Sequence, residues 1–314
     1  MKTFVLPLKK INKNSVAQAG GKGANLGEMV KANHPIPPGF VILASAFDYF
    51  IEDADINVEI QSHLDRINTK DINSVDRAAH EIRDIINRST IPVSIRREIE
   101  SNFKKYHLKW AAVRSSATAE DSKIASWAGE LETYLYVNGK ELIDTVKACW
   151  SSLFTPRAIF YRYEKRLHKK PISVAVVVQQ MVAADVAGVV FTAHPVTKDK
   201  KQMVIEAGWG LGEALVSGLI TPDTYIVNKN DRTIVDINVS PQSKMIVKKS
   251  TGGSKVKSIS SAKRNQQKLS SKQILELAEQ CLKIEKHYRH PQDIEWALSR
   301  GQWSILQTRP ITTL

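Results

Sequence analysis

The sequence has little of what marks several common classes of protein. Cysteine occurs only twice among 314 residues, as Cys149 and Cys281, with no close pair. This excludes a disulfide-rich scaffold and a zinc ribbon, and it is typical of the reduced cytoplasm. No apolar run approaches the roughly 20 residues that span a bilayer, and the apolar stretch before Pro7 is too short for a secretory signal. We therefore expect a cytoplasmic protein with no membrane partner.

The composition is otherwise that of a globular protein with an excess of positive charge. Hydrophobic residues make up 42% and charged residues 25%, which excludes wholesale disorder. Lysine and arginine number 45 against 32 acidic residues, a formal net charge of +13. Such an excess favours nucleic acid, an anionic small molecule or simply a basic solvated surface. The basic residues are spread along the chain without a familiar nucleic-acid motif, so we expect no nucleic-acid partner.

Hydrophobic periodicity predicts a helix-rich part followed by a sheet-rich part. Helical spacing occurs in 24–32, 73–87 and 142–153, and strands are predicted at 173–181, 186–192, 203–207, 224–228 and 232–238. The polar segment 250–271 is predicted to be an exposed, partly mobile loop. A serine-capped helix from about Ser271 to Tyr288 and two strands, 293–298 and 303–308, follow. Because chains of this length usually form two domains or two lobes, we expect an α+β fold divided into residues 1–172 and 173–314.

A glycine-rich segment, Gly20-Gly21-Lys22-Gly23, precedes the first of these helices. Glycine lets backbone N–H groups approach an anion, a helix N-terminus adds a positive dipole end, and Lys22 supplies a full charge. The segment is not a P-loop, because its glycine spacing differs and no Ser or Thr follows the lysine. A flexible turn before a helix is the simpler interpretation of this segment alone.

Two further segments contain candidate nucleotide-binding residues. Arg114, in Val113-Arg114-Ser115-Ser116, emerges from a predicted strand before small hydroxyl residues, which suits a phosphate clamp. Its alternative is a surface loop in which Arg114 pairs with Glu120 or Asp121. In the second segment, 176–182, a strand that ends in an amide side chain and exposed backbone suits recognition of an adenine edge. An ordinary core strand is the alternative there.

The closing pair of strands predicts a metal site next to a phosphate-binding arginine. Alternation places Asp293 and Glu295 on one face of the first strand and predicts that Trp303, Ile305, Gln307 and Arg309 share a face of the second. If a three-residue loop, 300–302, joins the strands, Glu295 lies opposite Gln307 and Asp293 lies opposite Arg309. Two facing oxygen donors beside an arginine suit Mg²⁺ held against a polyphosphate. A two-residue loop would break this pairing, and a structural cross-strand salt bridge is the alternative.

Together these segments resemble the nucleotide-binding part of the phosphoenolpyruvate synthase (pyruvate, water dikinase) family, which includes pyruvate phosphate dikinase and rifampin phosphotransferase. The resemblance extends from about Lys9 to Pro310. Its motifs are Gly-Gly-Lys22-Gly-Ala-Asn-Leu-Gly-Glu, Val-Arg114-Ser-Ser-Ala-Thr-Ala-Glu-Asp, Ala-Gly129-Glu-Leu-Glu-Thr133, Val-Val-Val-Gln-Gln180-Met, Gly-Val-Val-Phe-Thr, and Asp-Ile-Glu295-Trp with Leu-Gln307-Thr-Arg309-Pro. The Ser-Ser-Ala-Thr-Ala-Glu-Asp form resembles the water-using members more than the phosphate-using dikinase.

The resemblance implies an ATP-grasp fold in which two lobes clasp ATP, with Mg²⁺. It implies that Lys22 and Arg114 bind phosphates, that Gly129 and Thr133 lie in a loop over them, and that Gln180 faces adenine. It further implies that Glu295 and Gln307 bind Mg²⁺ and that Arg309 contacts the terminal phosphates, so that Lys22, Arg114 and Arg309 are the catalytic residues. Related enzymes transfer the β-phosphate of ATP to a histidine on a separate swivelling domain, for onward transfer to pyruvate or to a drug hydroxyl.

The carrier histidine is absent from these 314 residues, which contain no Gly-Gly-x-x-x-His-Ala-type segment. His194 occupies a position that the family usually fills with Asn or Asp, so we expect it to be a loop residue. We expect the phosphohistidine carrier domain and the acceptor-binding domain elsewhere, in cis if this is part of a longer enzyme or in trans if it is a split subunit. The alternative function is a non-catalytic nucleotide-binding or regulatory protein derived from this family.

Overall fold

The computed structural model describes residues 2–118, 131–168 and 172–311, and it divides into two compact units. The first comprises 1–28 and 38–181, and the second comprises 29–37 and 182–314. This division differs from the expected boundary at 172/173. The reason is that strand β5 (Val174–Gln180) pairs with two strands of the first unit and so belongs to its sheet.

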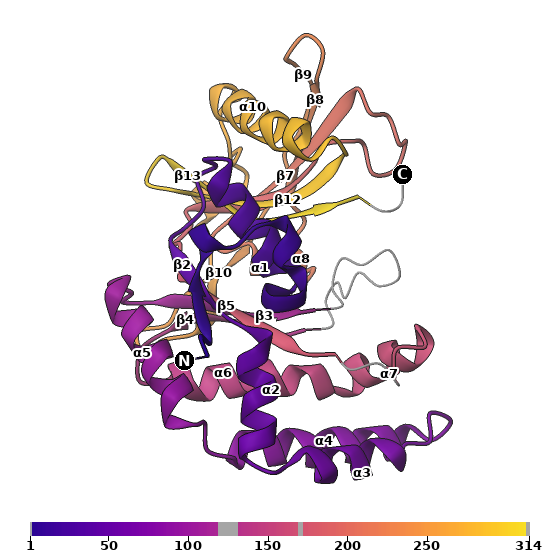
Figure 1. Cartoon of the computed structure of the whole chain (residues 1–314). Helices are drawn as coiled ribbons and strands as arrows, with labels where there is room; N and C mark the ends of the chain where they lie inside the picture. Colours follow the sequence, from indigo (N-terminus) through magenta and orange to yellow (C-terminus); the bar gives the residue numbers. More distant parts are fainter. Residues whose placement is uncertain (1, 119–130, 169–171, 312–314) are drawn as a thin grey trace. The chain divides into compact units, whose positions relative to one another are not determined.

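A five-stranded antiparallel sheet organises the first unit. Its order is β1 (Val5–Pro7), β2 (Gly39–Ile42), β5, β3 (Ala111–Ala117) and β4 (Thr133–Val137). The run Val174–Val178 in the central strand is buried throughout, which agrees with its nearly continuous valine sequence. Figure 1 shows this sheet above α6 and α7, with α3 and α4 beyond them.

Most helices of the first unit build its core against one face of this sheet. They are α2 (Ala44–Asp53), α3 (Asn57–Asp65), α4 (Ile72–Arg88), α5 (Val93–Lys105), α6 (Leu142–Ser151) and α7 (Pro156–Glu164). Trp150 of α6 is fully buried and stacks on Phe50 of α2 at a centroid distance of 5.0 Å. The predicted helices at 73–87 and 142–153 correspond to α4 and α6.

A six-stranded antiparallel sheet organises the second unit. Its order is β13 (Gln302–Pro310), β12 (Gln292–Ser299), β6 (Val186–Phe191), β7 (Gln202–Trp209), β8 (Asp223–Asn228) and β9 (Thr233–Asn238). Helix α10 (Ser271–Tyr288) packs on it, with Ser270 forming the predicted serine cap through a hydrogen bond from the Gln273 backbone N–H. The α+β class expected from the sequence is thereby confirmed.

The polar segment after β9 is more regular than predicted. Strand β11 (Ser254–Ser258) pairs with β10 (Lys244–Lys248), and a short helix α9 (Ser261–Arg264) follows, so the expectation of a loop over 250–271 is wrong. The strands of this hairpin are mostly solvated, so their sequence lacks the apolar alternation of a half-buried strand. Backbone pairing forms them without that signal.

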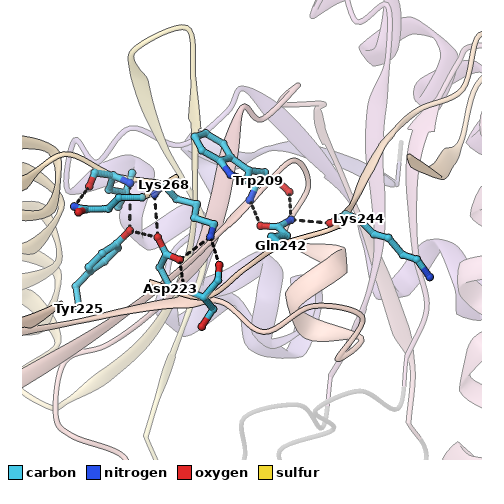
Figure 2. Close-up of polar contacts among 9 residues, drawn as sticks. Trp209, Asp223, Tyr225, Gln242, Lys244 and Lys268 are labelled. Carbon is cyan, nitrogen blue, oxygen red and sulfur yellow. Dashed lines mark hydrogen bonds and ion pairs between the residues drawn. The ribbon is translucent and has the colours of Figure 1, made fainter. Parts of the chain in front are cut away.

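A buried ion pair anchors this polar segment to the sheet (Figure 2). The Lys268 ammonium donates to the Asp223 carboxylate at 2.7 Å, and both side chains are fully buried. Asp223 also accepts from the Tyr225 hydroxyl at 2.7 Å and from the Ser240 backbone N–H at 3.0 Å. Because each charge is paired and further hydrogen-bonded, the burial of both is compensated.

Gln242 makes a second attachment of the same segment (Figure 2). Its side chain accepts from the Trp209 backbone N–H at 2.8 Å and donates to the Trp209 and Lys244 carbonyls at 3.0 and 2.9 Å. The amide therefore joins the end of β7 to the start of β10.

Among the described residues, no helix has the length and apolar character needed to cross a membrane.

Candidate functional site

The glycine-rich segment is a helix start that packs against strand β3. Helix α1 (Val16–Lys31) is interrupted at Gly20, whose φ of 67° and ψ of 174° are not helical. The Ser116 hydroxyl of β3 donates to the Ala19 carbonyl at 2.8 Å and accepts from the Gly23 backbone N–H at 3.1 Å. Regular helix therefore resumes directly after Gly20, three residues earlier than predicted, and places Lys22 in its first turn.

Arg114 lies two residues before Ser116 on the same strand, so both side chains belong to one face of the sheet. Arg114 is buried, with 8% of the residue exposed. Cross-strand pairing places Thr133 of β4 directly opposite Arg114. The structure thus brings three predicted residues, Lys22, Arg114 and Thr133, to neighbouring segments of the first unit.

The end of β5 has a glutamine on each face. Gln179 pairs with Ala112 and therefore lies on the face of Arg114, where it is 3% exposed. The predicted adenine contact, Gln180, pairs with Ala111 and is exposed at the end of the strand. The sequence pattern did not single out Gln179, because alternation distinguishes the two faces of the strand but does not indicate which face carries the nucleotide site.

Glu132 is a further residue that the sequence analysis did not select. Its backbone carbonyl accepts from the Ser115 hydroxyl at 2.7 Å, and its carboxylate accepts from Arg83 at 2.9 Å and from the Tyr134 hydroxyl. Burial, together with the hydrogen bond to Glu132, raises the pKa of Tyr134. These contacts fix the chain just before β4. Gly129, Glu120 and Asp121 lie outside the described residues.

In the second unit, β12 and β13 pair as the metal-site hypothesis requires. Glu295 lies opposite Gln307 and Asp293 opposite Arg309, whose guanidinium donates to the Asp293 carboxylate at 2.7 and 2.6 Å. The salt bridge considered as an alternative is therefore present, beside the two facing oxygen donors. Glu295 is half-buried and Gln307 is 8% exposed.

The route to this pairing differs from the expected one. The turn contains two residues, Arg300 and Gly301, both with positive φ (51° and 76°), as a type I′ turn requires. A bulge at Leu306 of β13, opposite the step from Glu295 to Trp296, then restores the predicted pairing of Glu295 with Gln307. The expectation that Trp303 and Ile305 share a face with Gln307 is consequently wrong. They pair with Leu298 and Trp296 on the apolar face, where the Trp296 and Trp303 rings lie 5.5 Å apart.

Carboxylates gather on the face of this sheet that carries Glu295. Glu206 of β7 and Glu295 both lie opposite Val189 of β6, one from each side. Burial raises the pKa of Asp293, an effect that Arg309 opposes and Glu295 adds to. Burial also raises the pKa of Glu206, with a further contribution from the charge of Asp293. A divalent cation would relieve this concentration of negative charge.

The donor set suits Mg²⁺ bound together with a phosphate rather than a cage made of protein ligands alone. Among the described residues, no group of three or more His, Cys, Asp or Glu side chains is arranged to hold a metal ion. Glu295 and Gln307 instead offer one carboxylate and one amide oxygen. Mg²⁺ in phosphate-handling enzymes typically takes one or two protein carboxylates and completes its shell with water and substrate phosphate.

His194 has a local structural role. Its Nδ1 atom accepts hydrogen bonds from the Val196 and Thr197 backbone N–H groups at 3.3 and 3.2 Å. These bonds shape the turn before β7, much as an Asn or Asp side chain does. The structure therefore agrees with the expectation of a loop residue.

Three comparisons relate the chain to known proteins. The family model described as pyruvate phosphate dikinase, AMP/ATP-binding domain, matches residues 16–314. A probable phosphoenolpyruvate synthase of Archaeoglobus fulgidus is 45% identical over 99% of this chain, and rifampicin phosphotransferase of Bacillus subtilis is 37% identical over 100% of it. The chain spans 42% and 36% of their respective lengths. Among solved structures, D-alanine–D-alanine ligase from Helicobacter pylori is similar with a TM-score of 0.31 and 12% identity, over 76% of this chain and 54% of that one.

Proposed function

The chain belongs to the pyruvate phosphate dikinase AMP/ATP-binding domain family, and we propose that it is the ATP-binding part of a dikinase-type phosphotransferase with an ATP-grasp fold. In this proposal it transfers the β-phosphate of ATP to a histidine on another domain or subunit, which passes it to an acceptor such as pyruvate or a drug hydroxyl. The structural observation that carries it is the double hydrogen bond of Ser116 to Ala19 and Gly23. It holds the turn that contains Lys22 against the strand that contains Arg114.

Each residue has a defined chemical task in this proposal. Lys22 and Arg114 neutralise phosphate oxygens, and the low exposure of Arg114 strengthens its charge-assisted hydrogen bonds. The Thr133 hydroxyl, opposite Arg114, contributes a neutral donor, and the resemblance assigns Gly129, which lies outside the described residues, to the same phosphate site. Gln180, at the end of β5, contacts the adenine.

The second group of residues handles the terminal phosphates. Arg309 is oriented by its two contacts to Asp293, so its guanidinium is preorganised for a phosphate. Glu295 and Gln307 would hold Mg²⁺ through one oxygen each. The bound ion would supply charge stabilisation to the phosphates.

The test is label transfer from β-labelled ATP to a separately prepared phosphohistidine carrier domain of this family. We expect acid-labile phosphate on the carrier and none on this chain, and strongly reduced transfer by Arg114→Ala. Arg96→Ala, on the exposed face of α5, is the matched control and should leave transfer unchanged. Binding of ATP without any transfer to the carrier would instead favour a nucleotide-binding or regulatory protein. Stable label on this chain would overturn the proposed route.

A further inference from the structure

A basic concave site lies beside the C-terminal end of α10 in the second unit. Its volume is about 750 Å³, within the roughly 300–1,000 Å³ range of small-molecule sites. Its basic lining consists of Lys200, Arg232, Lys283, Lys286, Arg289 and His290. None of these residues belongs to the nucleotide, metal or phosphate contacts proposed above.

The two acidic residues of the lining are already paired. Glu279 contacts the Arg232 guanidinium, and Glu285 accepts from Lys229, outside the lining, at 2.7 Å. In the described part of the chain, the other cations of the lining have no ion-pair partner; these are Lys200, Lys283, Lys286 and Arg289. The site therefore keeps an excess of positive charge.

This concentration of charge exceeds what the helix explains. Cations in the last turn of a helix are stabilised by its dipole, which accounts for charges near the end of α10. Lys200 comes instead from the segment between β6 and β7, and Arg232 from the turn between β8 and β9. Cations converging from three segments repel one another. A bound anion would remove that repulsion.

The backbone supplies a second observation. Arg232 and Arg289 have φ values of 61° and 56°, a left-handed conformation that favours glycine or asparagine. Arg289 is the residue that ends α10, a position where glycine is preferred. Backbone preference therefore does not account for arginine at either position. A guanidinium at these positions can donate two parallel hydrogen bonds to a phosphate.

We propose that this site binds a small multivalent phosphate anion, of the oligophosphate or bisphosphate class, independently of the nucleotide. Arg289 and the lysines of α10 would contact one phosphate group, and Lys200 and Arg232 another. The segment Arg289–Pro291 leads directly into β12, whose first residue, Gln292, donates from its backbone to the Thr192 hydroxyl at 2.8 Å. Occupancy of the site would thus affect the backbone at the start of β12, the strand that carries Asp293 and Glu295.

The test is calorimetric titration of the chain with inorganic triphosphate at constant ionic strength, both without nucleotide and with saturating Mg-ATP. We expect saturable binding in both conditions, weakened at least about tenfold in a Lys283→Gln/Lys286→Gln variant. A Lys255→Gln/Lys257→Gln variant, on the exposed strand β11, removes the same charge outside the site and should bind normally.

Arg289→Gly separates the site from the stability of the fold. Glycine adopts the left-handed conformation without strain, so this variant should unfold at the same or a higher temperature while binding triphosphate more weakly. Equal loss of binding in both lysine variants would show unspecific attraction and overturn the proposal. Absence of saturable binding at millimolar triphosphate, or its complete displacement by Mg-ATP, would overturn it as well. Because the titration without nucleotide does not depend on ATP, failure of the proposed phosphotransferase function would leave its outcome unaffected.

Discussion

Gly20 lies so close to Ser116 that a Cβ atom on the glycine would be 2.2 Å from the Ser116 carbonyl oxygen and 2.2 Å from its hydroxyl oxygen. The contact is made by the strand backbone, which cannot move without disturbing β3. Since the Ser116 hydroxyl also bonds to both sides of this turn, at Ala19 and Gly23, the turn and the strand form one rigid contact. Glycine is required here for space and for its φ of 67°.

Gly20→Ala should therefore destabilise the protein by roughly 2–5 kcal/mol, because a left-handed alanine costs about 1–2 kcal/mol and overpacking adds about 1–3 kcal/mol. Urea unfolding measures the loss. Gly218→Ala is the matched control, since Gly218 has a similar φ of 70° but nothing within 4 Å of an added Cβ. We expect only the conformational cost there. Equal losses in the two variants would contradict the steric part of the argument.

The buried pair Lys268–Asp223 predicts a large effect of removing one partner. Lys268→Met keeps much of the side-chain volume but leaves Asp223 without its counter-ion, which typically costs about 3–5 kcal/mol. Lys272→Met removes an exposed lysine, 3.9 Å from Glu276, and should change stability by less than about 1 kcal/mol. Thermal unfolding of both variants checks the difference. A small effect of Lys268→Met would mean that the pair does not hold the segment to the sheet.

The pairing of Glu295 with Gln307 shows what the sequence could and could not predict. Alternation and a plausible loop length led to the observed partners, but the loop is one residue shorter and a bulge compensates. The adjacent apolar residues Ile305 and Leu306 are the trace of that bulge, since strict alternation would not place them together. Register therefore depended on turn and bulge chemistry that periodicity alone does not contain.

Burial inside α10 shows a similar limit. Of its apolar residues, Leu275 and Leu282 are only half-buried, whereas Leu277 is fully buried. The type and limits of the helix followed from its cap and period, but the exact buried stripe depends on the sheet beneath it. The solvated hairpin of β10 and β11 was missed for a related reason, because its order comes from pairing and from anchors such as Gln242.

His34 predicts a loss of stability on mild acidification. Burial, followed by the nearby charges of His287 and Lys283, lowers the pKa of His34 below its ordinary value of 6.5. The unfolded chain therefore binds a proton more readily than the folded chain, so stability falls as the pH drops below about 6.5. Melting temperatures between pH 5 and 8 should show a weaker pH dependence for His34→Gln than for the wild type. His80→Gln, at an exposed position of α4, controls for loss of a histidine, and an unaltered profile in His34→Gln would refute the assignment.

The last prediction separates metal binding from phosphate binding. Stabilisation of the wild-type chain by ATP should be larger with Mg²⁺ than with a chelator, because a ligand that binds only the folded state stabilises it by mass action, by about 2.7 kcal/mol at a hundred times its Kd. Glu295→Gln keeps the shape of the side chain but removes the anionic oxygen that a hard cation prefers. The increment due to Mg²⁺ should then disappear, while the stabilisation by ATP alone remains.

Lys22→Ala should show the opposite pattern, with weaker stabilisation by ATP whether or not Mg²⁺ is present, because it removes a charged phosphate contact of about 1.5–3 kcal/mol. Glu276→Gln, at a partly exposed position of α10, repeats the charge change of Glu295→Gln outside the site and should behave as the wild type. In label transfer to a carrier domain, Glu276→Gln should match the wild type and Lys22→Ala should be slower. Glu295→Gln should lose roughly 10²-fold or more in rate. A Glu295→Gln variant that keeps the full increment due to Mg²⁺ would place the metal on other residues. The pairing with Gln307 would then be a feature of the sheet alone.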